Sequence, residues 1–229
     1  MEEKKRWWGL VRRRQCLVPT WRGWLALLLC FGLALFVAGR NLHHFLSVTE
    51  PAPGGLLVVE GWASDFVVQW ALNEFKTNHY DRLLVTGGPI EKGAPFSEYK
   101  TYADLGAATL LKLGLTTNEV QAVPAPWVRQ DRTYTAAVAL KNWLLARGLT
   151  ATRVNLITVG PHARRSRLLL QKVLGKEVVV GVVAIAPDDY DAEHWWRSSA
   201  GVRGVIGEGL AYAYARVWFR EPRNVEKSQ

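Results

Sequence analysis

Five short apolar runs alternate with segments of helical periodicity over most of this chain, and this alternation constrains the fold more than any other feature. The runs are rich in Val, Leu and Ile without polar alternation, as in strands buried on both faces. They cover Leu56–Glu60, Arg82–Thr86, Val120–Val123, Val154–Thr158 and Val178–Ile185. The predicted helices cover Asp65–Thr77, Ser97–Leu113, Thr133–Arg147, a segment that opens after His162 and ends near Gly175, and Val202–Phe219.

Strands separated by helices of this length are typical of right-handed crossovers in a parallel sheet. We therefore predict an α/β fold, a doubly wound domain with a mostly parallel sheet over residues 56–220, followed by a tail over 221–229. Ser97 is expected to cap the second helix.

An uncharged apolar segment precedes this domain. Residues 23–39 read GWLALLLCFGLALFVAG between Arg22 and Arg40, which is the short end of a membrane span. The positive-inside rule then places a basic segment, residues 1–22, in the cytoplasm, and a linker over 40–55 leads to a domain outside the membrane. We predict a single-pass protein of the inner (plasma) membrane that contacts lipid through residues 23–39. Two alternatives are a signal peptide cleaved after Val37-Ala38-Gly39 and a buried core helix.

Most of the net charge of +9 belongs to this N-terminal region. Eight of the 29 Lys and Arg residues and two of the 20 acidic residues precede residue 41, which leaves 21 basic and 18 acidic residues in the body. A nucleic-acid-binding domain would carry a basic stripe, so we predict no nucleic-acid partner. Both cysteines, Cys16 and Cys30, lie before the body, which therefore has no disulfide and no Cys-ligated metal site. We predict no metal site.

The segment from Asn155 to Arg167, NLITVGPHARRSR, combines a strand, a turn and a helix start. A helix N-terminus offers free N–H groups and a positive dipole end. With His162, Arg164 and Arg165 beside it, this point is a candidate anion site. The alternative is that the arginines line the solvent face of a surface helix.

Ligands of such sheets bind beyond the carboxyl ends of the strands, and this rule selects the other candidates. Glu60 or Glu98 is a candidate base or, alternatively, a ligand of a divalent ion. Gly87 and Gly88 let backbone N–H groups approach a ligand, although they can equally form a simple turn. The remaining candidate ligand-binding residues are Gly61, Ser97, Arg132, Thr133 and Gly160. The P-loop, dinucleotide, zinc-protease and α/β-hydrolase motifs do not occur.

Four motifs in order resemble the YdcF/SanA/ElyC-like family of bacterial proteins, a domain of unknown function numbered 218. The family has V-S-G-G, S-E, N-T-x-E-N-A and V-T-S-x-x-H-x-x-R-A. The counterparts here are Val85–Gly88, Ser97-Glu98, Asp131–Ala137 and Thr158–Ser166, within a resemblance that spans Leu56 to Val183. The chain departs from the family at Thr135 and Ala136, which replace Glu and Asn; His162 and Arg165 match.

The resemblance implies a Rossmann-like three-layer fold. Several members of the family carry an N-terminal membrane anchor, and members are linked to peptidoglycan or surface-polysaccharide biogenesis, so the resemblance implies these properties here as well. It supplies no reaction or cofactor. We predict a protein of cell-envelope biogenesis that binds or processes an anionic ligand, a phosphorylated glycan or a polyprenyl-linked precursor, with His162 as acid/base and Arg165, with Arg164 or Arg132, on the anion. The alternatives are a non-catalytic adaptor, suggested by the aromatic residues from Trp195 to Phe219, and a binder of S-adenosylmethionine or a nucleotide, since one member is similar to such a binder.

Overall fold

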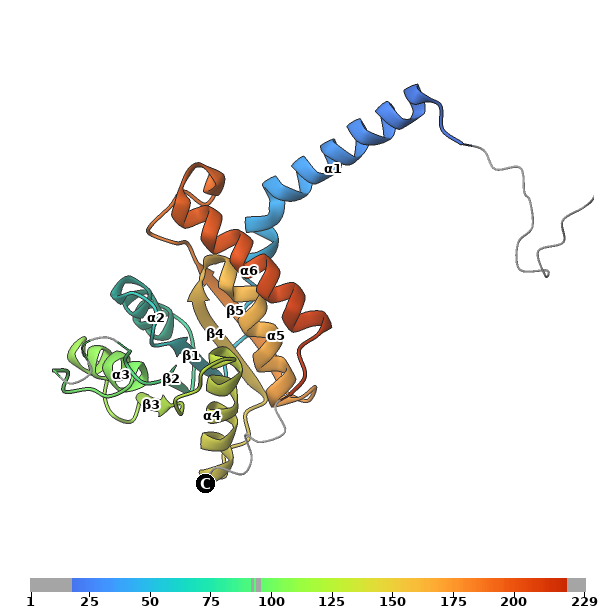
Figure 1. Ribbon diagram of the computed structural model, residues 1–229. Helices are drawn as coiled ribbons and strands as arrows, with labels where there is room; N and C mark the ends of the chain where they lie inside the picture. The colour runs from blue at the N-terminus through green and yellow to red at the C-terminus, as the bar shows by residue number, and fades with distance from the viewer. Residues whose placement is uncertain (1–17, 92, 94–95, 222–229) are drawn as a thin grey trace, which may run out of the picture. The chain divides into compact units, whose positions relative to one another are not determined.

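The computed structural model describes residues 18–91, 93 and 96–221 (Figure 1). The predictions made for residues 1–17 and 222–229 lie outside the described residues. The chain divides into two compact units, residues 1–40 and residues 41–229.

Helix α1 (Trp21–Leu46) is long and apolar enough to cross a membrane. Its 26 residues correspond to about 39 Å at 1.5 Å per residue, more than the hydrocarbon core of a bilayer. The apolar side chains of residues 25–37 are exposed, Leu28 for example by 65%, whereas those of a core helix would be buried. The helix also continues beyond the predicted end at residue 39. The reason lies in the second unit, where Leu42 and Leu46 pack with Trp195 and Val205 and hold the start of the predicted linker in helical form.

The second unit is built on a five-stranded, all-parallel sheet in the order β3-β2-β1-β4-β5, as predicted for an α/β fold of the Rossmann-like type. The strands are β1 (Leu56–Glu60), β2 (Arg82–Gly87), β3 (Val120–Pro124), β4 (Arg153–Val159) and β5 (Val179–Ile185). The helices are α2 (Asp65–Thr77), α3 (Tyr102–Lys112), α4 (Arg132–Ala146), α5 (Ala163–Leu174) and α6 (Ser199–Val217), with short 3-10 turns η1 (Gly160–His162) and η2 (Trp195–Arg197).

Each face of the sheet carries one layer of helices, which explains why the strand sequences are apolar throughout. Along β1, Leu57 and Val59 belong to the apolar cluster that α2 and α3 complete. Val58, between them, belongs to the cluster completed by α4 and α5 on the opposite face. Successive residues of a strand point to opposite faces, so a strand that is covered on both sides needs an apolar residue at every position.

The predicted start of the helix after β2 is wrong. Helix α3 begins at Tyr102 instead of Ser97, because the hydroxyl of Thr101 accepts a hydrogen bond from the backbone N–H of Asp104 at 3.0 Å and also donates to the Asp104 carboxylate at 2.6 Å. This reciprocal pair satisfies the start of the helix. Ser97 instead accepts a hydrogen bond from the backbone N–H of Tyr99 in the preceding loop, at 3.1 Å.

The order of the strands determines where a ligand can bind. From β1 the chain proceeds through β2 to β3 on one side, and it then crosses back to β4 and β5 on the other side (Figure 1). The helices that follow β1 and β4 therefore lie on opposite faces of the sheet, and a crevice opens between the carboxyl ends of these two strands.

Candidate functional site

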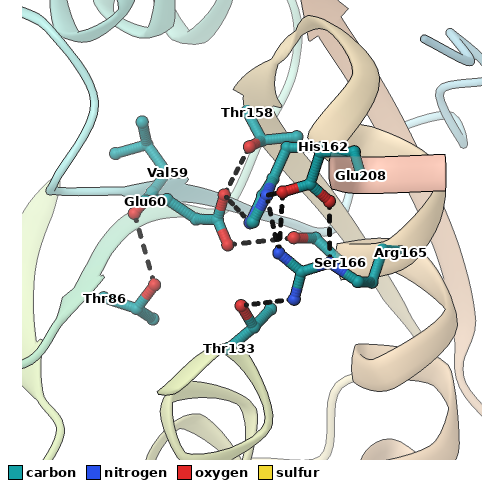
Figure 2. A network of polar contacts seen from close by, with 9 residues as sticks. All are labelled: Val59, Glu60, Thr86, Thr133, Thr158, His162, Arg165, Ser166 and Glu208. Atoms are coloured by element: carbon teal, nitrogen blue, oxygen red, sulfur yellow. Dashed lines mark hydrogen bonds and ion pairs between the residues drawn. The ribbon is translucent and has the colours of Figure 1, made fainter. Parts of the chain in front are cut away.

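A buried carboxylate occupies the end of the central strand β1. Glu60 is 5% exposed. One of its oxygens, Oε2, accepts a hydrogen bond from the hydroxyl of Thr158, and the other, Oε1, accepts one from the hydroxyl of Ser166 at 3.1 Å (Figure 2). Thr158 lies on β4 and Ser166 on α5. The carboxylate is therefore held by the two elements on the other side of the crevice.

His162, the last residue of η1, lies between Glu60 and a second carboxylate, Glu208 of α6 (Figure 2). Its Nδ1 atom is 2.8 Å from Oε1 of Glu208. Its Nε2 atom is 3.6 Å from Oε2 of Glu60, which is the distance of an ion pair and too long for a hydrogen bond. The ring of Trp62 stands edge-on to the imidazole, with 5.1 Å between the centroids.

Arg165, one turn further along, also binds Glu208. Its Nε donates to Oε2 of that carboxylate at 2.7 Å, and its Nη2 donates to Oε1 at 2.9 Å. This is the two-point geometry in which guanidinium and carboxylate groups pair most strongly. The outer nitrogen, Nη1, reaches the hydroxyl of Thr133 at the start of α4, 3.2 Å away.

These contacts determine the charges of the site. Burial by itself would lower the pKa of His162, but the charge of Glu60 and the hydrogen bond to Glu208 outweigh it and raise the pKa to about 9. Burial would raise the pKa of Glu208, and the hydrogen bonds from His162 and Arg165 lower it to about 2. The pKa of Glu60 is lowered in spite of its burial, chiefly by the charge of His162. At neutral pH the network therefore holds two positive and two negative groups.

Of the two candidate cations beside His162, the structure brings only Arg165 into the site. Arg164 points away: its Nε donates to the carbonyl of Phe45, and its guanidinium lies over the ring of Phe45, 4.1 Å from the centroid. Arg132 lies at the rim, where it pairs with Glu91 at 2.5 Å and is 68% exposed.

The remaining predicted site residues take different positions. Glu98 is exposed in the loop before α3, and neither Glu98 nor Ser97 belongs to the residues that line the hollows described below. Gly160 has φ of +37° and lies against Pro187, so it forms the turn that positions His162.

Two of the predicted glycines serve close packing of α3 against the sheet. A Cβ atom on Gly61 would lie 2.4 Å from the carbonyl oxygen of Tyr102, and one on Gly87 would lie 2.8 Å from the backbone nitrogen of Ala103. Gly88 differs, because a Cβ atom there would meet nothing closer than 4.0 Å. A methyl group there would be in ordinary van der Waals contact with the carbonyl oxygens of Ala125 and Pro126, without a clash.

Two hollows meet at this edge of the sheet. The first, which we call the charged hollow, holds about 500 Å³ and is lined by His162, Arg165, Glu208, Asp131 and apolar side chains of α5, of α6 and of the segment that follows α6. The second, which we call the aromatic hollow, holds about 100 Å³ beyond β1, β2 and β3 and has Glu60 among its lining residues. Trp62, Arg132 and Thr133 line both and form the divide between them.

The strand-end rule also selects Trp62, but the prediction from sequence missed three residues of this site: Thr158, Ser166 and Glu208. Only Glu208 carries a signal in the sequence, because it is the single acidic residue in a final helix that otherwise consists largely of Gly, Ala and apolar residues. Thr158 and Ser166 are ordinary strand and helix residues until the fold turns them toward Glu60. Within the described part of the chain, no group of three or more His, Cys, Asp or Glu side chains is placed to hold a metal ion.

Comparison with known proteins yields no relative: no family model, no curated protein and no solved structure matches the chain. The resemblance to the YdcF/SanA/ElyC-like family therefore stays a prediction that rests on the four motifs.

Proposed function

We propose that this chain is a membrane-anchored protein of cell-envelope biogenesis that binds, and acts by proton transfer on, a phosphorylated glycan or polyprenyl-linked precursor. The observation that carries the proposal is the buried pair His162 and Arg165 at the charged hollow. Each retains a donor nitrogen that no carboxylate holds by a hydrogen bond. Nη1 of Arg165 contacts Thr133, and Nε2 of His162 has no hydrogen-bond partner among the described residues.

The balance of charge in the network limits how an anion would bind. Glu60 and Glu208 neutralise His162 and Arg165, so the site does not attract anions over a long range. It instead offers short-range N–H donors in a partly desolvated setting, where a charge-assisted hydrogen bond is strongest. A phosphate that entered beside Thr133 would receive a hydrogen bond from Nη1 of Arg165 while Glu208 keeps the other edge of the guanidinium.

The walls of the charged hollow favour a ligand with an apolar part. Leu169, Ala211, Tyr214 and Phe219 line it together with the charged groups. A polyprenyl phosphate combines an anionic head with a hydrocarbon chain and so matches both parts of this lining. The apolar helix α1 would keep such a protein at the membrane in which these lipids reside.

His162, which is hydrogen-bonded to Glu208 and ion-paired with Glu60, provides the proposed means of proton transfer. A protonated His162 can donate from Nε2 to a leaving or bridging oxygen, and Glu60 can accept a proton from an attacking hydroxyl or water. Glu208 orients the imidazole and stabilises its charge, as the carboxylate partner of a catalytic histidine does.

Titration of the full chain in detergent with a polyprenyl phosphate and with a sugar nucleotide tests the proposal. We expect His162→Ala and Arg165→Ala each to weaken binding of the polyprenyl phosphate at least tenfold. Arg164→Ala, which removes a neighbouring cation that faces away, should change binding less than twofold. The conservative variants His162→Gln and Arg165→Lys repeat the test with side chains of similar size, so that no cavity is left in the network. Equal binding in all variants would refute this site.

The proposed topology places the N-terminus in the cytoplasm and the second unit outside the inner membrane. It rests on the basic residues that precede α1. A topology reporter fused after Gln229 should be active only in its extracytoplasmic form. A cytoplasmic signal would refute the proposed location and favour the S-adenosylmethionine or nucleotide alternative, since those cofactors are cytoplasmic.

A second candidate function, a non-catalytic adaptor, is favoured by the outer face of α6. Apolar side chains recur there at helical spacing and stay exposed: Val202, Ile206, Leu210, Val217 and Trp218, with Leu210 69% and Trp218 67% exposed. Contiguous exposed apolar surface often marks a protein interface. Capture of envelope-synthesis proteins that is lost in Leu210→Ser with Trp218→Ser, and kept in His162→Ala, would favour the adaptor. The opposite pattern would favour the ligand site.

A further inference from the structure

The aromatic hollow lies beside the proposed anion site but contains neither of its cations. Its walls come from the loops after β1, β2 and β3 and from the starts of α3 and α4. Three aromatic side chains line it, Trp62, Tyr102 and Trp127. Trp62 and Trp127 are 46% and 69% exposed, so they contribute little to the packing of the core. Their exposed ring surface is therefore available for contact with a ligand.

The charges of the aromatic hollow do not favour a phosphate as its occupant. Glu60 lies at its floor, and the only other charged side chains among its lining residues in the described chain are the mutually paired Arg132 and Glu91 at its rim. The lining is therefore neutral to negative. Each charge of this lining already has a partner, Glu60 with His162 and Arg132 with Glu91, so none is left to attract an anionic group. A neutral ligand with hydroxyl groups would find an acceptor in the Glu60 carboxylate.

Shape and polarity together point to a saturated ring. The volume of about 100 Å³ suits one ring-sized group, and the absence of a side chain at Gly88, which lines this hollow, leaves room at the end of β2. A pyranose has an apolar face of C–H groups that packs on an indole and an equatorial rim of hydroxyls that hydrogen-bond to carboxylate and threonine. Pockets that bind small molecules are usually lined by apolar and aromatic side chains with a few polar groups, as this hollow is.

We propose that the aromatic hollow is a sugar-ring subsite, in which Trp127 and Trp62 pack on a hexose or amino-sugar ring and Glu60 accepts one of its hydroxyls. This inference rests on the proposed function and deepens it. The ligand would carry its ring in the aromatic hollow and its phosphate and lipid in the charged hollow. The bond that joins the two parts would cross the divide at Trp62 and Thr133, beside the ion pair of Glu60 and His162.

Saturation-transfer NMR on the full chain in detergent, with N-acetylglucosamine and glucose as probes and adenosine as the competing ring, tests the subsite. We expect at least one of the two sugars to bind and Trp127→Ala to weaken that binding at least fivefold. The same variant should change binding of a polyprenyl phosphate without a sugar less than twofold. Trp218→Ala, an equally exposed tryptophan outside both hollows, is the matched control and should leave the sugar signal unchanged.

The outcomes separate this inference from the proposed function. Absence of a signal from both sugars, an unchanged signal in Trp127→Ala, or a Trp127-dependent signal from adenosine alone would overturn the sugar-ring subsite. None of these results alters the expected loss of polyprenyl phosphate binding in His162→Ala and Arg165→Ala. Failure of that loss would instead refute the anion site while leaving the sugar measurement to decide the aromatic hollow.

Discussion

The two sides of the carboxyl edge of the sheet are built from different chemistry. Around β1 and β4, four charged side chains from four elements bind one another in a buried network (Figure 2). Around β2 and β3, the strand ends carry glycines, prolines and aromatic residues, and the charged pair at the rim is exposed. The proposed function assigns proton chemistry and anion binding to the first side, and the proposed subsite assigns recognition of a neutral ring to the second.

The two sides of the edge also differ in how much their charged residues affect the free energy of unfolding. A charge in the buried network cannot be removed without leaving its partners desolvated and unpaired, whereas a charge on the aromatic side is already in contact with water. The following changes should therefore have effects that decrease in order from the buried network to the rim.

Glu208→Ala should have the largest effect, because it leaves the guanidinium of Arg165 and the imidazole of His162 buried with one carboxylate between them. We expect a loss of about 3 kcal/mol in the free energy of unfolding. Urea unfolding of the full chain in detergent, followed by tryptophan fluorescence, measures it. A loss below about 1 kcal/mol would show that the network does not exist in the folded protein.

The stability should also depend on pH with a defined sign. The pKa of His162 is raised from 6.5 to about 9, so the stabilisation by its charge is complete below pH 6.5 and is lost as the pH rises through 9. The lowered pKa of Glu208, about 2, gives stabilisation that is complete above pH 4.5 and is lost as the pH falls toward 2. The alkaline loss should be on the order of 3 kcal/mol.

Unfolding curves measured between pH 5 and 9.5 check this prediction. The wild type should lose stability steadily above pH 6.5, and His162→Gln should show a much smaller slope. A wild-type protein with constant stability from pH 6.5 to 9 would mean that His162 is not held between two carboxylates.

Two neighbouring glycines distinguish packing from ligand binding on the aromatic side. Gly87→Ala forces a methyl group against the backbone of Ala103 at 2.8 Å and should cost about 2 kcal/mol in stability. The methyl group of Gly88→Ala would reach the carbonyl oxygens of Ala125 and Pro126 only at 4.0 Å, which is ordinary contact. The variant should leave the stability unchanged within about 0.5 kcal/mol, while it narrows the aromatic hollow and weakens sugar binding. Equal stability losses in the two variants would contradict this assignment.

Glu91→Ala should have the smallest effect. The pair that it breaks with Arg132 is more than half exposed on both sides, and exposed pairs contribute about 0.5 kcal/mol or less. The same urea unfolding measures it. A loss as large as that of Glu208→Ala would remove the distinction between the two sides.

Much of this fold can be predicted from the sequence. The continuous apolar runs predict the five strands to within one or two residues of their ends, because a strand covered on both faces requires an apolar residue at each position. Glu60, Arg165 and His162 are predictable from the rule that parallel strands present their carboxyl ends at one edge. The pattern of Ser97-Glu98 misleads, because the stronger cap at Thr101 lies four residues further on.

The partners of these residues are not predictable from local pattern. Glu208 lies 46 residues from His162 along the chain and reaches the site only because α6 packs beside α5. The opposite directions of Arg164 and Arg165 follow from a rotation of about 100° between adjacent helix residues, and the sequence alone does not tell which of the two faces inward.

An experimental structure of the full chain with a bound polyprenyl-linked sugar phosphate most directly tests whether the charged hollow binds the phosphate and the aromatic hollow binds the sugar. We expect the phosphate within hydrogen-bond distance of Nη1 of Arg165 or Nε2 of His162 and the sugar ring against Trp127. A phosphate bound at the outward-facing Arg164, with both hollows unchanged, would contradict the proposed site and leave the buried network a structural feature alone.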